Sequence, residues 1–162
     1  MVEIRRATGA DSETISSLLL EAFISVKDQY TQGAFEYTTP PAEVIRSRFV
    51  EGPIWVAIDG DQIVGTVSGL PEPDRYYIRS MAVKPSAQGV GVGQRLLETL
   101  EQQARQEGFS VLYLYTTHSL HSARRMYERN GYRTTRETPP EEFFGTAGIE
   151  MEKIIGEANE GQ

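Results

Sequence analysis

Residues 88–97, QGVGVGQRLL, place three glycines on alternate positions directly before a leucine-rich helical pattern. Glycine is among the poorest helix formers, so this arrangement at a helix start needs a physical reason. The first turn of a helix offers unpaired backbone N–H groups and partial positive charge, which together attract anions. Without Cβ atoms, the glycines let phosphate oxygens approach those N–H groups. The stretch therefore predicts a phosphate-binding loop, and the alternative is close packing of the helix against a sheet.

Common nucleotide motifs do not fit this stretch. A Walker A loop requires Lys followed by Ser or Thr after its last glycine, whereas Gln94 and Arg95 follow Gly93 here. A dinucleotide-binding fingerprint requires a third glycine where this chain has Gln94 or, in the shifted frame, Leu96. Both patterns fail at a residue that their chemistry needs, so a nucleotide-phosphate enzyme is only a distant alternative.

Hydrophobic periodicity and turn residues predict the elements on either side of the loop. Strands are expected at residues 2–6, 54–58, 63–70, 76–83, 111–117, 132–138 and 147–155, and helices after Thr8, at 42–50, from the glycines to Gly108 and at 119–130. The first helix carries its apolar residues on one face: Ile15, Leu18, Leu19, Ala22, Phe23 and Val26. Residues 28–41 are expected to form a loop, although Tyr30, Phe35, Glu36 and Tyr37 are unusual for a simple connector.

Strands interleaved with helices predict an α/β fold with one mixed central β-sheet and helices on both faces. A length of 162 residues suits a single domain. We expect residues 1–155 to form this domain and residues 156–162 to form a flexible tail, because the tail has no side chains to bury.

The composition excludes several classes of protein. The chain has no cysteine, which removes disulfides, thiolate metal sites and a cysteine nucleophile. A formal charge of −7 argues against nucleic-acid binding, and the arginines from 124 to 136 fit a solvated helix face or a contact to a phosphorylated cofactor. No signal peptide or membrane-spanning apolar run is visible, so the expected location is the cytoplasm, with no membrane partner.

Two stretches resemble motifs of the GNAT superfamily of N-acetyltransferases. Residues 88–93, QGVGVG, resemble the acyl-CoA pyrophosphate loop of this family, Q/R-x-x-G-x-G/A. The preceding strand ends in MAVKP, and residues 123–132 resemble the family motif A-x-x-L-Y-x-x-x-G-F/Y. The predicted element order matches the family along almost all of the chain. The resemblance implies a GNAT-like fold and acetyl-CoA as the cosubstrate, without a metal.

The resemblance also implies a place for each part of coenzyme A. The strand at 76–83 would splay from the strand at 111–117, and the pantetheine arm would pair with strand backbone in that gap. The Met81 side chain is expected to pack rather than to react. The N–H groups of the loop would bind the diphosphate. The implied cofactor-binding residues are Met81, Ala82, Val83, Gln88, Gly89, Val90, Gly91, Val92 and Gly93.

Tyr127 matches the general-acid position of the family. A phenol with a pKa of about 10 stays protonated at neutral pH and can donate a proton to the departing CoA thiolate. The alternative is a core tyrosine at helical spacing from Ala123.

Two positions depart from the family pattern. Leu120 stands where many members have an asparagine that binds pantetheine, and Tyr77 stands where many have a glutamate. An acceptor ammonium with a pKa of about 10.4 is almost fully charged at pH 7, so its proton must be removed. The candidates for this step, acting through water, are Glu36, Glu72, Asp74 and His118. His118 and His121 are too few for a metal site and fit a turn or capping role.

The expected function is transfer of an acetyl group from acetyl-CoA to a primary amine, by direct attack in a ternary complex. The alternative is a non-catalytic acyl-CoA binding module or sensor, which the departures favour and Tyr127 opposes. Residues 28–41 and 71–74 are acidic and aromatic, and we expect them to wall an acceptor site suited to a cationic amine. Protein lysines, protein N-termini, polyamines and drug-like amines all stay open as acceptors, as do a monomer and a homodimer.

Overall fold

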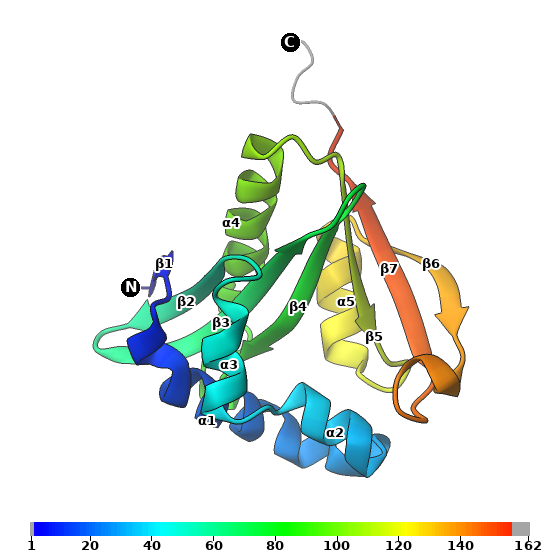
Figure 1. The fold of residues 1–162 in the computed structure, drawn as a ribbon, viewed down its shortest axis with the longest axis horizontal. Helices are drawn as coiled ribbons and strands as arrows, with labels where there is room; N and C mark the ends of the chain where they lie inside the picture. Colours follow the sequence, from blue (N-terminus) through cyan, green and yellow to red (C-terminus); the bar gives the residue numbers. More distant parts are fainter. Residues whose placement is uncertain (1, 157–162) are drawn as a thin grey trace.

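Seven strands form one mixed sheet in the computed structural model, which describes residues 2–156 (Figure 1). The strands are β1 (Val2–Arg6), β2 (Ile54–Asp59), β3 (Gln62–Pro71), β4 (Tyr76–Val83), β5 (Val111–Thr116), β6 (Arg133–Thr138) and β7 (Gly148–Ile154). Their order across the sheet is β1-β2-β3-β4-β5-β7-β6. Only the β4–β5 pair is parallel, and the other neighbours are antiparallel.

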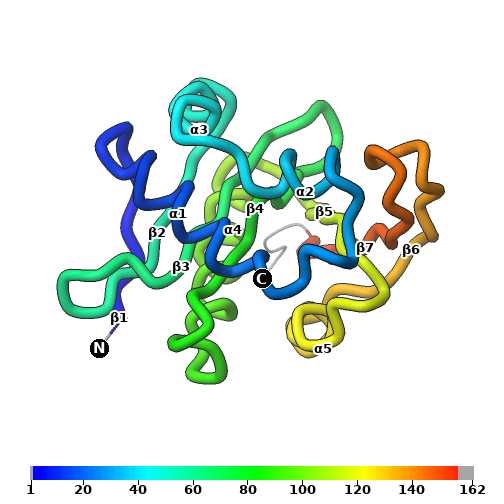
Figure 2. Tube along the Cα trace, turned by 90° about the horizontal axis from the view of Figure 1, so that it is seen from below, coloured from blue at the N-terminus to red at the C-terminus, as the bar shows by residue number. Residues whose placement is uncertain are grey.

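Helices cover both faces of this sheet. The helices α1 (Ser12–Phe23), α2 (Gln32–Thr38) and α3 (Ala42–Arg48) precede β2, whereas α4 (Val92–Gln106) and α5 (His121–Arg129) follow β4 and β5. Alternation along β2 separates two cores: Trp55 and Ala57 pack with α4, and Ile54 and Val56 pack with α1 and α3. Seen from below, α2 and α3 lie on one side of the strands and α5 on the other (Figure 2).

The predicted α/β fold with a mixed central sheet is confirmed. Helix α4 buries Leu96, Leu97, Leu100 and Ala104 completely, as its periodicity predicts. The expected cap at the end of α5 is also present, because Gly131 has a left-handed backbone with φ of 96°. The predicted tail, residues 156–162, lies outside the described residues apart from Gly156.

The predicted loop at residues 28–41 is wrong, because it contains helix α2. The Thr31 side chain caps this helix by accepting a hydrogen bond from Ala34 N at 3.1 Å. Ala34 and Phe35 are buried, so tertiary contact supplies what a seven-residue helix lacks by itself. The predicted first helix also ends earlier than expected: α1 stops at Phe23, and Val26 lies in a kinked 3₁₀ segment, Ile24–Gln29.

Helix α4 supplies a direct test of the fold. Leu100 is fully buried, and Leu100→Ala should lower the free energy of unfolding by about 2–5 kcal/mol because it leaves a cavity. The matched control is Gln102→Ala on the exposed face of the same helix, which should change this free energy by less than about 0.5 kcal/mol. Urea unfolding followed by circular dichroism measures both values. Equal effects of the two substitutions would contradict the assigned core.

Candidate active site

Strands β4 and β5 pair along only part of their length. Their register contains Tyr76↔Leu112 and Tyr77↔Tyr113 and nothing further, although β4 continues to Val83 and β5 to Thr116. The two strands diverge beyond this point (Figure 1). The expected splay between these strands is therefore present, and it leaves strand backbone that no neighbouring strand pairs with.

A β-bulge bends β4 at the start of this gap. The register with β3 shifts between Thr66 and Ser68, and Ser80 on β4 adopts a φ of 57°. A positive φ is strained for a residue other than glycine, and such strain collects at functional sites. The Nη1 atom of Arg48 donates a hydrogen bond to Ser80 Oγ at 2.9 Å. Helix α3 thus holds the bulge from one face of the sheet.

The glycines of the loop have two different structural reasons. Gly89 and Gly91 have φ values of 86° and 89°, and an added Cβ at either would meet no atom within 4 Å. They give the backbone a left-handed conformation beside open space at the start of α4, as an anion site requires. Gly93 lies inside α4, where a Cβ would approach the methyl carbons of Met81 and Met126 at 3.2 and 3.3 Å. Its reason is close packing.

Two contacts join strand β4 to the glycine loop, one at Gln88 and one at Gly93. The side-chain amide of Gln88 donates a hydrogen bond to the carbonyl of Val83 at 3.1 Å. Met81 is half-buried beside Gly93, Val83 is half-buried, and Ala82 belongs to the core on the α1 side. Met81 therefore packs, as expected, and links the start of α4 to the gap between the strands.

A cavity of about 500 Å³ occupies the space between the diverging strands. Its lining comes from β4, β5, α5, α2 and the segment before β7. Of the predicted catalytic and cofactor-binding residues, Met81 and Tyr127 line this cavity, and Gly93 at the end of the loop lies beside Met81. Leu120, which replaces the family asparagine, lines it as well.

Tyr127 projects from α5 into the cavity wall and is 7% exposed. Burial, with a smaller contribution from Tyr30, raises the pKa of Tyr127 above its ordinary value of 10.0. The neighbouring phenol, Tyr132, instead donates its hydroxyl to Glu101 at 2.8 Å. Among the described residues, no hydrogen bond engages the Tyr127 hydroxyl.

Aromatic rings form the wall of the cavity on the α2 side. Tyr77 stacks on Tyr113 with ring centroids 5.0 Å apart, and Tyr115 meets Tyr77 edge-on at 5.8 Å. Residues 28–41 were expected to wall the acceptor site, and Tyr30 and Tyr37 do line the cavity, whereas the tyrosines of β5 were not expected there. The signal was present, because Tyr113 and Tyr115 are two positions apart on one strand and must share a face. Tyr37 of α2 contacts Phe143 and Phe144, which complete this wall.

The four candidates for proton removal have very different positions. Glu72 lines the cavity and accepts a hydrogen bond of 2.5 Å from the Tyr113 hydroxyl. Glu36 is exposed and accepts a hydrogen bond from Gln32, and Asp74 is exposed. His118 is 54% exposed and lies 3.8 Å from Glu137. Glu72 is the member of this group that faces the cavity.

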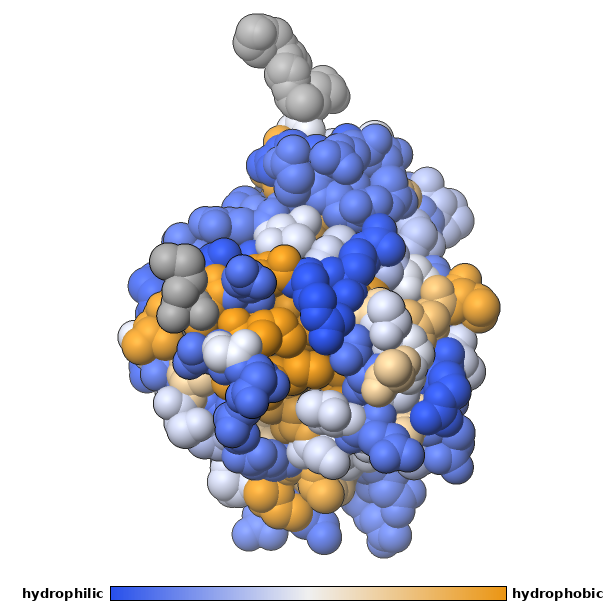
Figure 3. Space-filling model, turned by 90° about the vertical axis from the view of Figure 1, so that its left-hand side faces the viewer, coloured by the Kyte–Doolittle hydropathy of each residue, from blue (hydrophilic) through white to orange (hydrophobic). Residues whose placement is uncertain are grey.

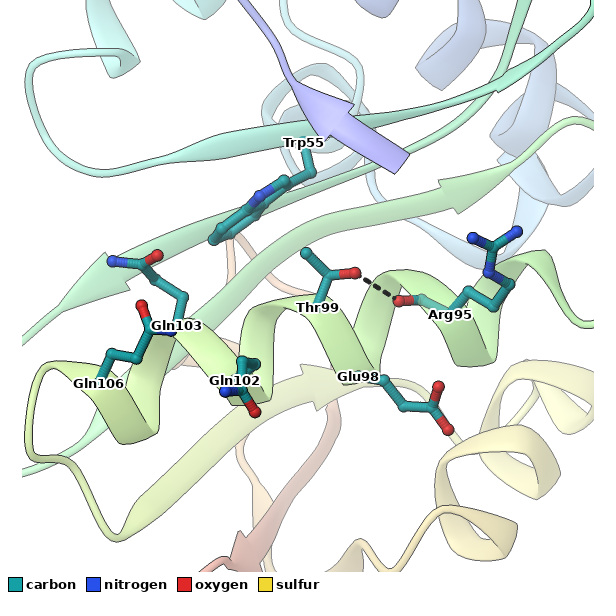
Figure 4. Close-up of a pocket in the computed structure, with 7 residues that line it drawn as sticks. All are labelled: Trp55, Arg95, Glu98, Thr99, Gln102, Gln103 and Gln106. Atoms are coloured by element: carbon teal, nitrogen blue, oxygen red, sulfur yellow. Dashed lines mark hydrogen bonds between the residues drawn. The ribbon is translucent and has the colours of Figure 1, made fainter. Parts of the chain in front are cut away.

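A second hollow, of about 390 Å³, lies between Trp55 on β2 and the polar side of α4 (Figure 4). Its lining includes Arg95, Glu98 and Thr99, and the Thr99 hydroxyl bonds back to the carbonyl of Arg95 at 2.9 Å. The molecule seen from the β1 side is largely hydrophilic around a smaller hydrophobic area (Figure 3). This hollow contains none of the predicted site residues, so we assign the site to the larger cavity.

Two further properties concern the described part of the chain. It contains no group of three or more His, Cys, Asp and Glu side chains arranged to hold a metal ion. Within residues 2–156, no helix is both long and apolar enough to cross a membrane.

Known proteins resemble this chain in both sequence and structure. The profile described as "Acetyltransferase (GNAT) family" matches residues 14–132. "Probable N-acetyltransferase family 8 member 5" of Mus musculus is 34% identical over 104 residues, which cover 60% of this chain and 46% of the mouse protein. "Uncharacterized N-acetyltransferase YhfO" of Bacillus subtilis is 28% identical over 137 residues, covering 81% of this chain and 89% of that protein.

Solved structures share the fold at low sequence identity. PaiA N-acetyltransferase from Thermoplasma acidophilum, solved in complex with coenzyme A, has a TM-score of 0.79 at 19% identity and covers 95% of this chain and 99% of its own. YncA of Salmonella typhimurium, solved with acetyl-CoA, has a TM-score of 0.76 at 20% identity and covers 96% of this chain and 95% of its own.

The family profile covers most of the chain, and the fold and cavity agree with it, so this protein belongs to the GNAT family of acetyltransferases. The chain spans about half the length of several curated mammalian relatives, such as 46% of the mouse protein and 48% of a rat one.

Proposed function

We propose that this protein is an acetyl-CoA-dependent N-acetyltransferase that acts on a primary amine in a ternary complex. The observation that carries the proposal is the gap between β4 and β5, which joins the glycine loop through Met81 to a cavity containing Tyr127. Strand backbone in the gap suits the amides of a pantetheine arm, and the start of α4 suits a diphosphate. Membership of an acetyltransferase family supports the acetyl donor.

In this mechanism, the amine nitrogen attacks the thioester carbon and the carbon–sulfur bond breaks. The sulfur takes a proton from the Tyr127 hydroxyl, whose raised pKa keeps it protonated at neutral pH. Glu72, directly or through water, takes the first proton of the acceptor ammonium before the attack. The nitrogen loses its second proton to water as the amide forms, and the Tyr127 phenolate regains a proton from water, so that one proton is released to solvent for each CoA thiol formed. No covalent enzyme intermediate forms, in keeping with a chain without cysteine.

Removal of the Tyr127 hydroxyl tests the acid. Tyr127→Phe should lower kcat by about 10²–10⁴, because the leaving thiolate loses its proton donor. The matched control, Tyr132→Phe, removes the neighbouring phenol that bonds to Glu101 outside the cavity and should keep most of the turnover. A thiol-release assay over a panel of amines measures both. Full activity of Tyr127→Phe would refute this role, and a non-catalytic acyl-CoA sensor would release no thiol with any amine of the panel.

The diphosphate-binding role of the loop is tested by substituting two glycines that have similar backbone conformations, one at each end of α4. Gly91 has a φ of 89° and Gly108 a φ of 91°, and neither has an atom within 4 Å of an added Cβ. Alanine at either position should cost about 1–2 kcal/mol of stability through the same strain. Only Gly91→Ala should also weaken coenzyme A binding, by about tenfold or more, because charge-assisted hydrogen bonds at the diphosphate are lost. Titration calorimetry measures the dissociation constant of coenzyme A for each variant. Equal constants for the two variants would show that the loop does not bind coenzyme A.

The pH dependence of a third variant tests the base. Glu72→Gln should lower kcat/KM at pH 7 by about 10²-fold, and this deficit should shrink towards pH 10. The reason is that the neutral fraction of an amine with a pKa of about 10.4 rises nearly tenfold per pH unit, so less proton removal is needed. Glu36→Gln, at an exposed carboxylate outside the cavity, is the control. A deficit that stays constant with pH would assign Glu72 a structural role.

A further inference from the structure

Two arginines lie buried against one wall of the cavity. Arg79 on β4 is 9% exposed and lines the cavity, and Arg48 on α3 is 5% exposed and close enough to interact electrostatically with Arg79. Arg48 donates to Ser80 Oγ and lies over the ring of Tyr37 at 5.6 Å, and both of these residues also line the cavity. Guanidinium groups are rarely buried without anionic partners, so the arrangement needs an explanation.

The negative charge around this pair does not balance it. Glu51 accepts a hydrogen bond of 2.6 Å from Arg79 Nη2, and its side chain is 44% exposed. Burial lowers the pKa of Arg48 and Arg79 lowers it further, whereas Tyr37, Glu51 and Tyr77 raise it. The cluster of Arg48, Arg79 and Glu51 thus contains two cations and one carboxylate, a local net charge of +1.

Arg79 also keeps an unused donor. Its Nε atom is buried and has no hydrogen-bond partner among the described residues. The same holds for Ser68 Oγ, and Ser68 is the register partner of Arg79 on β3, so the two side chains share one face of the sheet. A buried N–H of a charged group without a partner is costly, and this one belongs to a residue that lines the cavity.

We propose that Arg79, supported by Arg48, binds the carboxylate of an acceptor that carries both an amine and a carboxylate, as amino acids and their conjugates do. A carboxylate supplies the missing negative charge and accepts hydrogen bonds from the planar guanidinium in the geometry that arginine favours. The rings of Tyr77, Tyr113 and Tyr115 line the space for an apolar or aromatic body. This inference rests on the proposed function and narrows its acceptor from any amine to an amino-acid-like one.

An amino-acid-like acceptor still carries the cationic amine that the acidic and aromatic segments were expected to suit. The two carboxylates that line the cavity differ: Glu142 is paired with Arg136 through two hydrogen bonds of 2.9 and 3.0 Å, whereas Glu72 accepts its hydrogen bond from the Tyr113 hydroxyl and can still receive an ammonium. The excess positive charge lies at Arg79 instead. An acceptor with one charge of each sign uses both ends of the cavity, the ammonium at Glu72 and the carboxylate at Arg79.

Equilibrium binding tests the carboxylate site without any need for turnover. The probes are 3-phenylpropionate and its neutral amide, titrated by calorimetry into the protein saturated with coenzyme A. The carboxylate should bind about 10- to 100-fold more tightly than the amide. Arg79→Gln should reduce this preference to less than about threefold, and Arg79→Lys should restore part of it, because lysine keeps the charge without the planar fork.

Two further variants separate binding from a structural effect. Glu51→Gln removes the competing carboxylate and should strengthen 3-phenylpropionate binding severalfold, whereas a merely structural role for the ion pair predicts weaker binding or none. Arg46→Gln is the matched control, because Arg46 lies on the same helix as Arg48 but is exposed and does not line the cavity. It should keep the preference for the carboxylate.

Turnover supplies the second arm, with phenylalanine compared with its amide and with phenethylamine. A higher kcat/KM for phenylalanine that Arg79→Gln abolishes supports the inference. Faster turnover of the amines without a carboxylate, or equal binding of both phenylpropionate probes, overturns it and leaves the acetyltransferase proposal intact. Arg79-dependent carboxylate binding without thiol release from any amine would instead keep the binding site and refute the transferase.

Discussion

The early end of pairing between β4 and β5 is the constraint on which the site depends. Each strand is paired along its other edge: β5 pairs with β7 from Val111 to Thr116, and β4 pairs with β3 on both sides of the bulge. The sheet therefore stays continuous where the two strands touch and opens where they diverge. Unpaired strand backbone is costly without a partner, so an open gap lined by strands is a place for an extended ligand.

The two faces of this gap carry different chemistry because alternate residues of a strand point in opposite directions and the bulge at Ser80 shifts this alternation. Arg79 and Met81, two positions apart on β4, therefore lie on opposite faces. On the α4 and α5 side, Met81 and Met126 pack against Gly93, and Tyr127 reaches the cavity. On the α2 and α3 side lie the tyrosine wall and Arg79. One bulged strand thus separates an apolar side with a single phenol from an aromatic side with excess positive charge. In the proposed reaction, coenzyme A approaches from the side of α4 and α5, and the acceptor approaches from the side of α2 and α3.

Much of this arrangement follows from local sequence, and some of it does not. The periodicity of α4 and the glycines before it are local signals, and both describe the structure correctly at Gly89, Gly91 and Leu100. Helix α2 was missed because its seven residues gain stability from the burial of Ala34 and Phe35, not from helix propensity. Gly93 belongs to the same motif as Gly89 and Gly91, but a glycine is needed there because Met81 packs against it, and this contact is visible only in the structure.

The sequence by itself determined the order of most elements, the mixed sheet, the glycine turn before α4 and the place of Tyr127 on α5, because these depend on periodicity and on residue types at short spacing. Tertiary structure alone decided which acidic residue faces the cavity, which tyrosines line it and where Arg48 meets Arg79. Those residues lie far apart in the chain, and no local rule relates them. Their meeting follows from the register of β3, β4 and β5 and from the docking of α3, which the whole fold sets.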